Sequence, residues 1–190
     1  ELISYAQSKN IIVALTTNGS ASEKVIKKIA NTNIIRVSID GTESFHDNIR
    51  DYPGAYKKAI STIEFLKENG AKPQITSVFT PNTPPEILFE LAKESNKQGV
   101  KMGVNFQGVN INDRDNVHKT DNLKLFLSEY LKLIELLKKE HGNTILNCEP
   151  MPTIIKYGGL AAYGCKAMDV SISIKYDGNV SIPCTGLSLF

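Results

Sequence analysis

The sequence predicts an α/β fold in which parallel strands alternate with helices. From residue 11 to residue 107, segments with the apolar pattern of strands alternate with segments at amphipathic-helix spacing, joined by short connections. Such alternation indicates parallel strands linked by crossover helices. Several strands also carry polar residues on one face, more than the packed interior of a small closed barrel holds. Together these observations predict a wide, partial barrel that is occupied by a ligand.

The elements of this barrel are expected in a regular order. Residues 2–8 have the pattern of the end of an amphipathic helix, and the next helix follows a Ser20 or Ser22 N-cap. A charged loop is expected between the second strand and the third helix. The strands are expected at 11–19, 34–40, 73–80 and 100–107, and the helices at 21–31, 54–69 and 86–98.

Beyond residue 107 the pattern changes. Residues 108–119 are rich in Asn and Asp and predict a loop, and a long helix is expected from residue 120 to about residue 140. Its expected apolar side consists of Leu123, Leu127, Tyr130, Leu131, Ile134 and Leu137. A short helix is expected at 151–157, and an Asp-Gly turn predicts a hairpin over 170–183. The expected domains are a partial barrel at 1–110, a helical linker region at 111–160 and a separate C-terminal part at 161–190.

The strand at residues 34–40 is the best candidate for carrying a binding site. Alternation places Ile35, Val37 and Ile39 on one face, while Ser38 and Asp40 lie on the other, just before a glycine turn. A hydroxyl and a carboxylate in this position suit the hydroxyls of a ribose or the backbone of an amino acid. Arg50, at the end of the next segment, could bind a carboxylate through two N–H groups of its guanidinium. The alternative is a solvated strand end with an ordinary turn.

Composition limits the classes of partner. The chain has 190 residues, of which 41% are hydrophobic and 22% charged, as in an ordinary globular domain. A net charge of +2 supports neither nucleic acid nor an anionic membrane as a partner, and the expected location by default is cytoplasmic. Because the chain opens with Glu1 inside a helical pattern and stops soon after the hairpin, we expect it to be a piece of a longer protein.

The three cysteines predict a metal site near the hairpin. Cys165 precedes the first strand of the hairpin and Cys184 follows the second, so the two thiols should lie close together. Zinc and iron-sulfur centres usually take four protein ligands, and Cys148, His141 or further sequence would have to supply the others. Two buried thiols that pack as small hydrophobic groups are the alternative.

Four stretches in a fixed order resemble one family. They are TTNG at the end of the first strand, SIDG followed by FHDNIR, the helix GAYKKAISTIEFLKENG, and GCKAMDVSISIKYDGNVSIPC. This series is similar to radical S-adenosylmethionine enzymes that carry a C-terminal SPASM or twitch extension. The resemblance implies a partial (β/α)6 barrel whose first strand and CxxxCxxC loop precede this chain, with residues 161–190 as the start of the SPASM region.

The resemblance also implies which residues bind the cofactor. Ser38 and Arg50 match positions that contact the carboxylate and amino end of S-adenosylmethionine, and Asp40 would lie near its ribose. Thr17 and Asn18 would line the methionine or ribose side, and Gln107 the adenine. Cys165 and Cys184 match ligands of an auxiliary iron-sulfur cluster. His46 and Asp47 match a common pair in the family, for which loop structure is an equally good account.

The implied chemistry is reductive cleavage of S-adenosylmethionine by a reduced [4Fe-4S] cluster, which gives a 5′-deoxyadenosyl radical for hydrogen abstraction. Expected partners are an unknown peptide or small-molecule substrate and an electron donor such as ferredoxin or flavodoxin, with no nucleic acid and no membrane. Peptide or protein modification and cofactor maturation are the expected roles. Since no CxxxCxxC occurs in these residues, we expect this polypeptide alone to be inactive.

Two other functions stay open at this point. The first is an iron-free (β/α) enzyme that acts on a phosphorylated metabolite through Asp40 and Arg50, although the glycine-rich phosphate loop expected for it is poorly represented. The second is a non-catalytic binding module in which Cys148, Cys165 and Cys184 hold a structural zinc ion.

Overall fold

The computed structural model describes residues 1–107, 120–146, 173–174 and 180–181. The chain divides into two compact units. One consists of Glu1–Gln107 with Lys132–Asn147, and the other of Gly108–Leu131 with Cys148–Phe190. The division into a barrel, a helical linker and a C-terminal domain stays a prediction.

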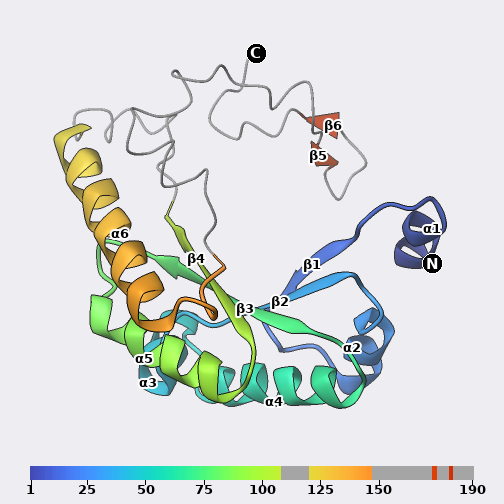
Figure 1. The fold of residues 1–190 in the computed structure, drawn as a ribbon. Coiled ribbons are helices and arrows are strands. Elements are labelled where there is room, and N and C mark those ends of the chain that lie inside the picture. The colour runs from blue at the N-terminus through green and yellow to red at the C-terminus, as the bar shows by residue number, and fades with distance from the viewer. Residues whose placement is uncertain (108–119, 147–172, 175–179, 182–190) are drawn as a thin grey trace. The chain divides into compact units, whose positions relative to one another are not determined.

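Four parallel strands form the central sheet of the first unit (Figure 1). They are β1 (Ala14–Thr17), β2 (Ile34–Ser38), β3 (Pro73–Phe79) and β4 (Lys101–Phe106), and they lie in the order in which they occur in the chain. All four strands were predicted, with β1 starting three residues later than expected. Beyond β4, a parallel bridge between Met102 and Ile145 continues the sheet. The parallel α/β fold is confirmed, whereas closure into a six-stranded partial barrel stays a prediction.

Helices cover one face of this sheet (Figure 1). Helix α4 contacts β2 and β3, α5 contacts β4, and α2 and α3 pack against α4. The helices are α1 (Leu2–Ser8), α2 (Glu23–Ile29), α3 (Glu43–Arg50), α4 (Ala55–Glu68), α5 (Pro85–Lys97) and α6 (Thr120–His141). This arrangement, with sequential strand order and helices on a single face, differs from a doubly wound sheet, which is covered on both faces.

The two faces of the sheet differ sharply in burial. The covered face carries the core, including Val37, Ile75, Met102 and Val104, each fully buried. The opposite side, which we call the open face, consists of side chains that are half-buried or exposed. Its members alternate with the core residues and are Ala14, Thr16, Ile34, Arg36, Ser38, Gln74, Thr76, Val78, Lys101, Gly103 and Asn105. The predicted polar face is therefore present, and among the described elements helices α2, α3, α4 and α5 lie on the other side of the sheet (Figure 1).

The expected charged loop after β2 is wrong, because residues 43–50 form helix α3. The sequence signals for it are an acidic residue, Glu43, in the first turn and a basic one, Arg50, in the last, both favourable to the helix dipole. Asp51 ends the helix in a left-handed conformation with φ 48°. Most residues of helix α3 are polar, and its buried residue is His46. The segment therefore lacks the apolar periodicity by which a helix is recognised in a sequence.

The C-terminal part is described only in places. In α6 the buried side is formed by Phe126, Tyr130, Leu133, Ile134 and Leu137, so three of the six expected core positions are buried. Leu127 and Leu131 are half-buried, and the side chain of Leu123 lies outside the described residues. Ser173–Ile174 (β5) and Val180–Ser181 (β6) pair antiparallel, as a hairpin requires. The expected loop at 108–119, the short helix at 151–157 and the hairpin turn lie outside the described residues. In the described part of the chain, none of the helices has the length and apolarity to cross a membrane.

Candidate functional site

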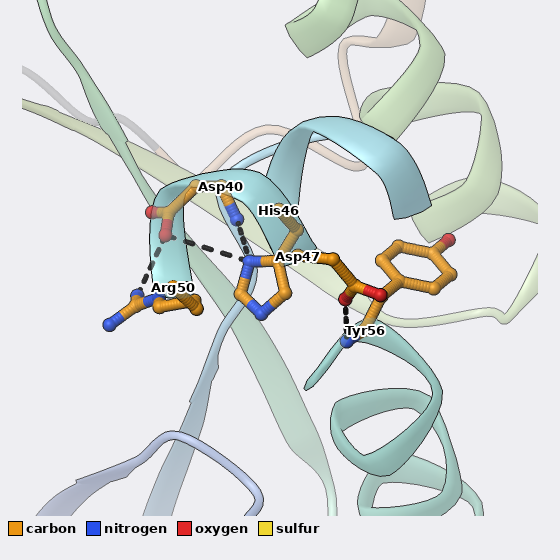
Figure 2. A network of polar contacts seen from close by, with 5 residues as sticks. All are labelled: Asp40, His46, Asp47, Arg50 and Tyr56. Carbon is orange, nitrogen blue, oxygen red and sulfur yellow. Dashed lines mark hydrogen bonds and ion pairs between the residues drawn. The ribbon is translucent and has the colours of Figure 1, made fainter. Parts of the chain in front are cut away.

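The end of β2 holds a buried ion pair. The Arg50 guanidinium, on the last turn of α3, lies 2.7 Å from Oδ2 of Asp40, whose side chain is 7% exposed (Figure 2). Burial raises the pKa of Asp40, but the contacts with His46 and Arg50 lower it more, so the pKa lies below the usual 3.8. The carboxylate therefore stays charged at neutral pH and holds Arg50 in place.

His46 supports this pair from inside the fold. Its Nδ1 accepts a hydrogen bond of 3.0 Å from the backbone N–H of Asp40, and the ring is almost fully buried (Figure 2). Nδ1 also approaches Oδ2 of Asp40 at 3.6 Å. Both contacts hold the His46 ring against Asp40, and the contact with His46 is one of the causes that lower the pKa of that carboxyl. His46 and Arg50 thus act together to keep Asp40 ionised.

Asp47 ties α3 to the start of α4. Its two carboxylate oxygens accept hydrogen bonds from the backbone N–H groups of Gly54 (2.6 Å) and Tyr56 (2.8 Å). These bonds satisfy free donors at the first turn of α4 and hold the pKa of Asp47 below its usual 3.8. From the sequence, loop structure was one explanation of His46 and Asp47. In the structure both residues belong to helix α3, where His46 contacts Asp40 and Asp47 binds the start of α4.

Gly41 allows the close packing that brings these groups together. A Cβ at this position would overlap Cγ2 of Ile87 in α5 and would lie 2.9 Å from the ring of Phe45 in α3. Glycine is therefore needed for α3 to start this close to the end of β2.

Ser38 is the last residue of β2, two positions before Asp40, and belongs to the open face. It stands opposite Thr76 of β3, whose hydroxyl accepts a hydrogen bond of 3.2 Å from the Asn105 side-chain amide. The C-terminal half of the open face is therefore lined by hydroxyl and amide groups. Sequence reasoning singled out Ser38 and the polar face of β4 but missed Thr76, although Gln74 and Thr76 alternate with buried Ile75 and Ser77 in the way that marks a polar face.

The other expected cofactor residues lie along the same edge of the sheet. Thr17 belongs to the covered face, in register with Val37, and its hydroxyl accepts a hydrogen bond of 3.1 Å from the N–H of Gly19. Its neighbour Thr16 faces the open side instead. Asn18 accepts hydrogen bonds from the N–H and hydroxyl of Ser20. Gln107 is exposed at the end of β4, where its N–H donates to Phe79.

The expected metal ligands Cys165 and Cys184, like Cys148, lie outside the described residues. Among the residues that are described, no three His, Cys, Asp or Glu side chains cluster as a metal site would require. The 190-residue sequence holds three cysteines and none of them is in a CxxxCxxC pattern. These residues therefore do not fit a catalytic [4Fe-4S] cluster of the family's kind.

Comparison with known proteins gives relatives for part of the chain. No protein-family model matches it. An AdoMet-dependent heme synthase of Methanosarcina barkeri is 34% identical over 100 residues, which is 50% of this chain and 29% of the relative. A second AdoMet-dependent heme synthase, from Oleidesulfovibrio alaskensis, is 34% identical over 99 residues, 49% of this chain and 26% of the relative. Each match thus spans less than a third of the relative's length.

Solved structures share the fold over a longer stretch. The crystal structure of Streptococcus suis SuiB covers 96% of this chain and 46% of its own, with a TM-score of 0.66 and 16% sequence identity. Over about half of its length, the chain is similar in sequence to radical S-adenosylmethionine enzymes. A second similar structure, anSMEcpe with bound AdoMet and Kp18Cys peptide, matches 71% of this chain and 40% of its own chain, with a TM-score of 0.51 and 19% identity. Identities this low show a common fold alone.

The described residues fit S-adenosylmethionine better than they fit a cluster. The cofactor brings a carboxylate, an amino group and ribose hydroxyls. The open face offers the Ser38 and Thr76 hydroxyls, and the partly exposed Arg50 guanidinium lies against Asp40 just beyond the end of β2. Gln74 adds a buried side-chain oxygen, Oε1, that has no hydrogen-bond partner within the described part of the chain. A polar face with an orphaned acceptor is typical of a surface that a ligand completes.

Proposed function

We propose that this chain forms the S-adenosylmethionine-binding wall of a radical S-adenosylmethionine enzyme. The observation that carries the proposal is the open face, whose polar end bears Ser38 next to a buried Asp40–Arg50 pair. Relatedness to AdoMet-dependent heme synthases and the superfamily fold support the choice of ligand.

In this proposal Arg50 binds the carboxylate of the methionine part of the cofactor. A guanidinium has five donors, so Arg50 can hold Asp40 with one edge and a carboxylate with another. Asp40 orients Arg50 through the ion pair, and the proposal also puts Asp40 near the ribose. The Ser38 hydroxyl binds the amino or carboxylate end, while Asn18 and Gln107 lie at the strand ends that would take the ribose and adenine.

S-adenosylmethionine supplies a 5′-deoxyadenosyl radical when a reduced [4Fe-4S] cluster cleaves it, and the radical abstracts hydrogen from the substrate. The contribution of the described residues is to bind and orient the cofactor on the open face. We propose that the cluster's ligands lie outside these 190 residues, with Cys165 and Cys184 serving an auxiliary iron-sulfur cluster of a SPASM-type region, and that the chain by itself does not cleave the cofactor.

The reaction proposed for the whole enzyme is the modification of a peptide or protein, or the maturation of a cofactor. It requires an electron donor such as ferredoxin or flavodoxin. Neither a nucleic acid nor a membrane is part of the proposal, in keeping with a net charge of +2.

Calorimetric titration with S-adenosylmethionine tests the proposal. Ser38→Ala and Arg50→Ala should each weaken binding about tenfold or more, the effect of losing a hydrogen bond to a charged group. Arg50→Lys keeps a cation beside Asp40 but loses the fork, so it should weaken binding while preserving the fold. Lys24→Gln, on exposed α2, serves as control. Wild-type affinity in both Ser38→Ala and Arg50→Lys would contradict the proposed site.

A further inference from the structure

Four side chains form a cross-strand row on the open face. Thr16, Arg36, Gln74 and Lys101 are register partners on β1, β2, β3 and β4. We call these four residues the lower row, because they lie two residues before the Ser38–Thr76 pair on their strands. At about 3.3 Å per residue, the lower row is some 7 Å from that pair along the strands. It is therefore close to the proposed cofactor site and separate from it.

The charge of the open face is one-sided. Its eleven strand residues include two cations, Arg36 and Lys101, and not one carboxylate. In the described part of the chain, neither cation has an ion pair or a hydrogen bond. Some lysines on the helices do pair with acids: Lys57 lies 3.1 Å from Glu43, and Lys93 lies 2.7 Å from Glu90. The acid nearest in the chain to the open face, Asp40, is already paired with Arg50.

Gln74 stands between the two cations. Its Oε1 is buried and lacks a hydrogen-bond partner within the described residues, although its side chain lies on the ligand side of the sheet. A buried amide without a partner costs free energy unless another molecule completes its hydrogen bonds. A ligand with both an acceptor for the amide nitrogen and a donor or water for Oε1 would do so.

The spacing suits one small anionic group. Neighbouring strands lie about 4.8 Å apart, so the backbones at Arg36 and Lys101 are separated by roughly 10 Å. Two long side chains can close over that distance on a single carboxylate, with the guanidinium fork on one side and the ammonium on the other. S-adenosylmethionine itself has a positive sulfonium centre, which two cations would repel, so the row is poorly suited to the reacting end of the cofactor.

We propose that the lower row binds a carboxylate of the enzyme's substrate and holds the substrate beneath the cofactor. This inference names a substrate class for the enzyme proposed above and in that sense rests on the proposed function. The partner is a small molecule or residue that carries at least one free carboxylate, held by Arg36 and Lys101. The Gln74 side-chain N–H is a further donor to that carboxylate, and a water molecule or a donor group of the same ligand satisfies Oε1.

A titration followed by NMR of the ¹⁵N-labelled chain tests the row directly. The probe is tricarballylate at low ionic strength, and its uncharged triamide is the matched control ligand. Tricarballylate should shift the signals of Arg36, Lys101 and the Gln74 side-chain amide, and the triamide should not. Arg36→Gln and Lys101→Gln should each weaken the response about tenfold or more. Arg36→Lys, which keeps the charge, should retain most of it, and Lys24→Gln should leave it unchanged.

Three results would overturn the inference. The first is an equal response to the triamide, and the second is an equal loss of the tricarballylate response in Lys24→Gln. The third is a wild-type chain that does not respond to tricarballylate, together with a folded Arg36→Gln variant that no longer binds S-adenosylmethionine. This third result would assign the row to the cofactor. Failure of the proposed function looks different. If tricarballylate binds the row as expected while S-adenosylmethionine does not bind the wild-type chain, the carboxylate site stands and the proposed function falls.

Discussion

Asp40 is the residue on which the candidate site depends most directly. Its charge is buried, its backbone N–H is bonded to His46, and its carboxylate is held by Arg50. The alternation of residues 34–40 and the carboxylate before Gly41 could be found in the sequence. The sequence could only suggest that Arg50 lies near Asp40. Helix α3, which was not predicted, is the element that brings the Arg50 side chain to Asp40.

Removing Arg50 should cost more stability than neutralising Asp40. Arg50→Ala leaves a buried carboxylate without its cation and should lower the free energy of unfolding by about 1–3 kcal/mol. Asp40→Asn leaves a guanidinium that is 37% exposed and can be hydrated, so its effect should be smaller. Urea denaturation measures both, and the reverse order would contradict the account of the pair.

The acid dependence of stability should follow from the same residues. Asp40 and Asp47 have pKa values below the usual 3.8 in the folded chain, so the unfolded chain binds protons first as the pH falls. Their contribution to stability is complete well above pH 3.8 and is lost as the pH falls through the lowered folded values. Asp40→Asn and Asp47→Asn should each make the acid limb of a stability–pH curve shallower. An unchanged acid limb in both variants would contradict these assignments.

Gly41 should tolerate no side chain. Gly41→Ala forces a methyl group against Ile87 and Phe45 and should destabilise the fold by about 1–3 kcal/mol. Gly103→Ala is the matched control, because its nearest neighbour, the Leu146 Cβ, lies at 4.0 Å, an ordinary contact. Thermal denaturation compares the two variants. Equal stability of both would show that α3 and α5 can move apart without cost.

At the scale of elements, α3 is the largest difference between expectation and structure. The segment 43–50 has polar residues in most positions, and its inward contacts are made by a histidine and by capping carboxylates, which apolar periodicity cannot reveal. Helices α4 and α5 were predicted within one residue at each end, because each has a regular apolar stripe. For α6, Phe126, Tyr130, Leu133 and Leu137 repeat at intervals of three and four and match the buried side better than the expected set does.

The two hydrogen bonds by which Asp47 of α3 holds the start of α4 can be tested by substitution of Asp47. Asp47→Ala removes both acceptors at the first turn of α4, so the melting temperature should fall and the Gly54 and Tyr56 amides should exchange faster with solvent. Asp47→Asn keeps one acceptor oxygen and should lie between Ala and wild type. Hydrogen exchange read amide by amide provides the measurement. Wild-type protection of both amides in Asp47→Ala would rule out the capping role.

For the whole molecule, the strand–helix alternation was enough to predict a parallel sheet with one polar face. It was not enough to place every site residue, since a shift of one residue reverses the face. Thr17 shows this: Thr16 is the residue on the open face, and Thr17 lies on the covered face with Val37. The roles of Cys165 and Cys184, and the extension that the resemblance implies for residues 161–190, stay predictions.

The chain alone should not produce 5′-deoxyadenosine. Anaerobic reconstitution with iron and sulfide, followed by reduction in the presence of S-adenosylmethionine, should yield no cleavage product, because these residues contain no CxxxCxxC. The same assay on a longer protein that includes such a loop should yield it. Cleavage by the 190-residue chain would show that its own cysteines can hold a catalytic cluster.

The most direct test of the central claim is an NMR map of S-adenosylmethionine binding to the wild-type chain. The account predicts signal changes confined to the C-terminal half of the open face and its edge, above all at Ser38, Asp40, Arg50 and Thr76. It predicts no change for core residues such as Ile63 and Leu91, which are fully buried in α4 and α5. Changes confined to the helical side, or none at saturating cofactor, would contradict the claim that the open face is the cofactor wall of a radical enzyme.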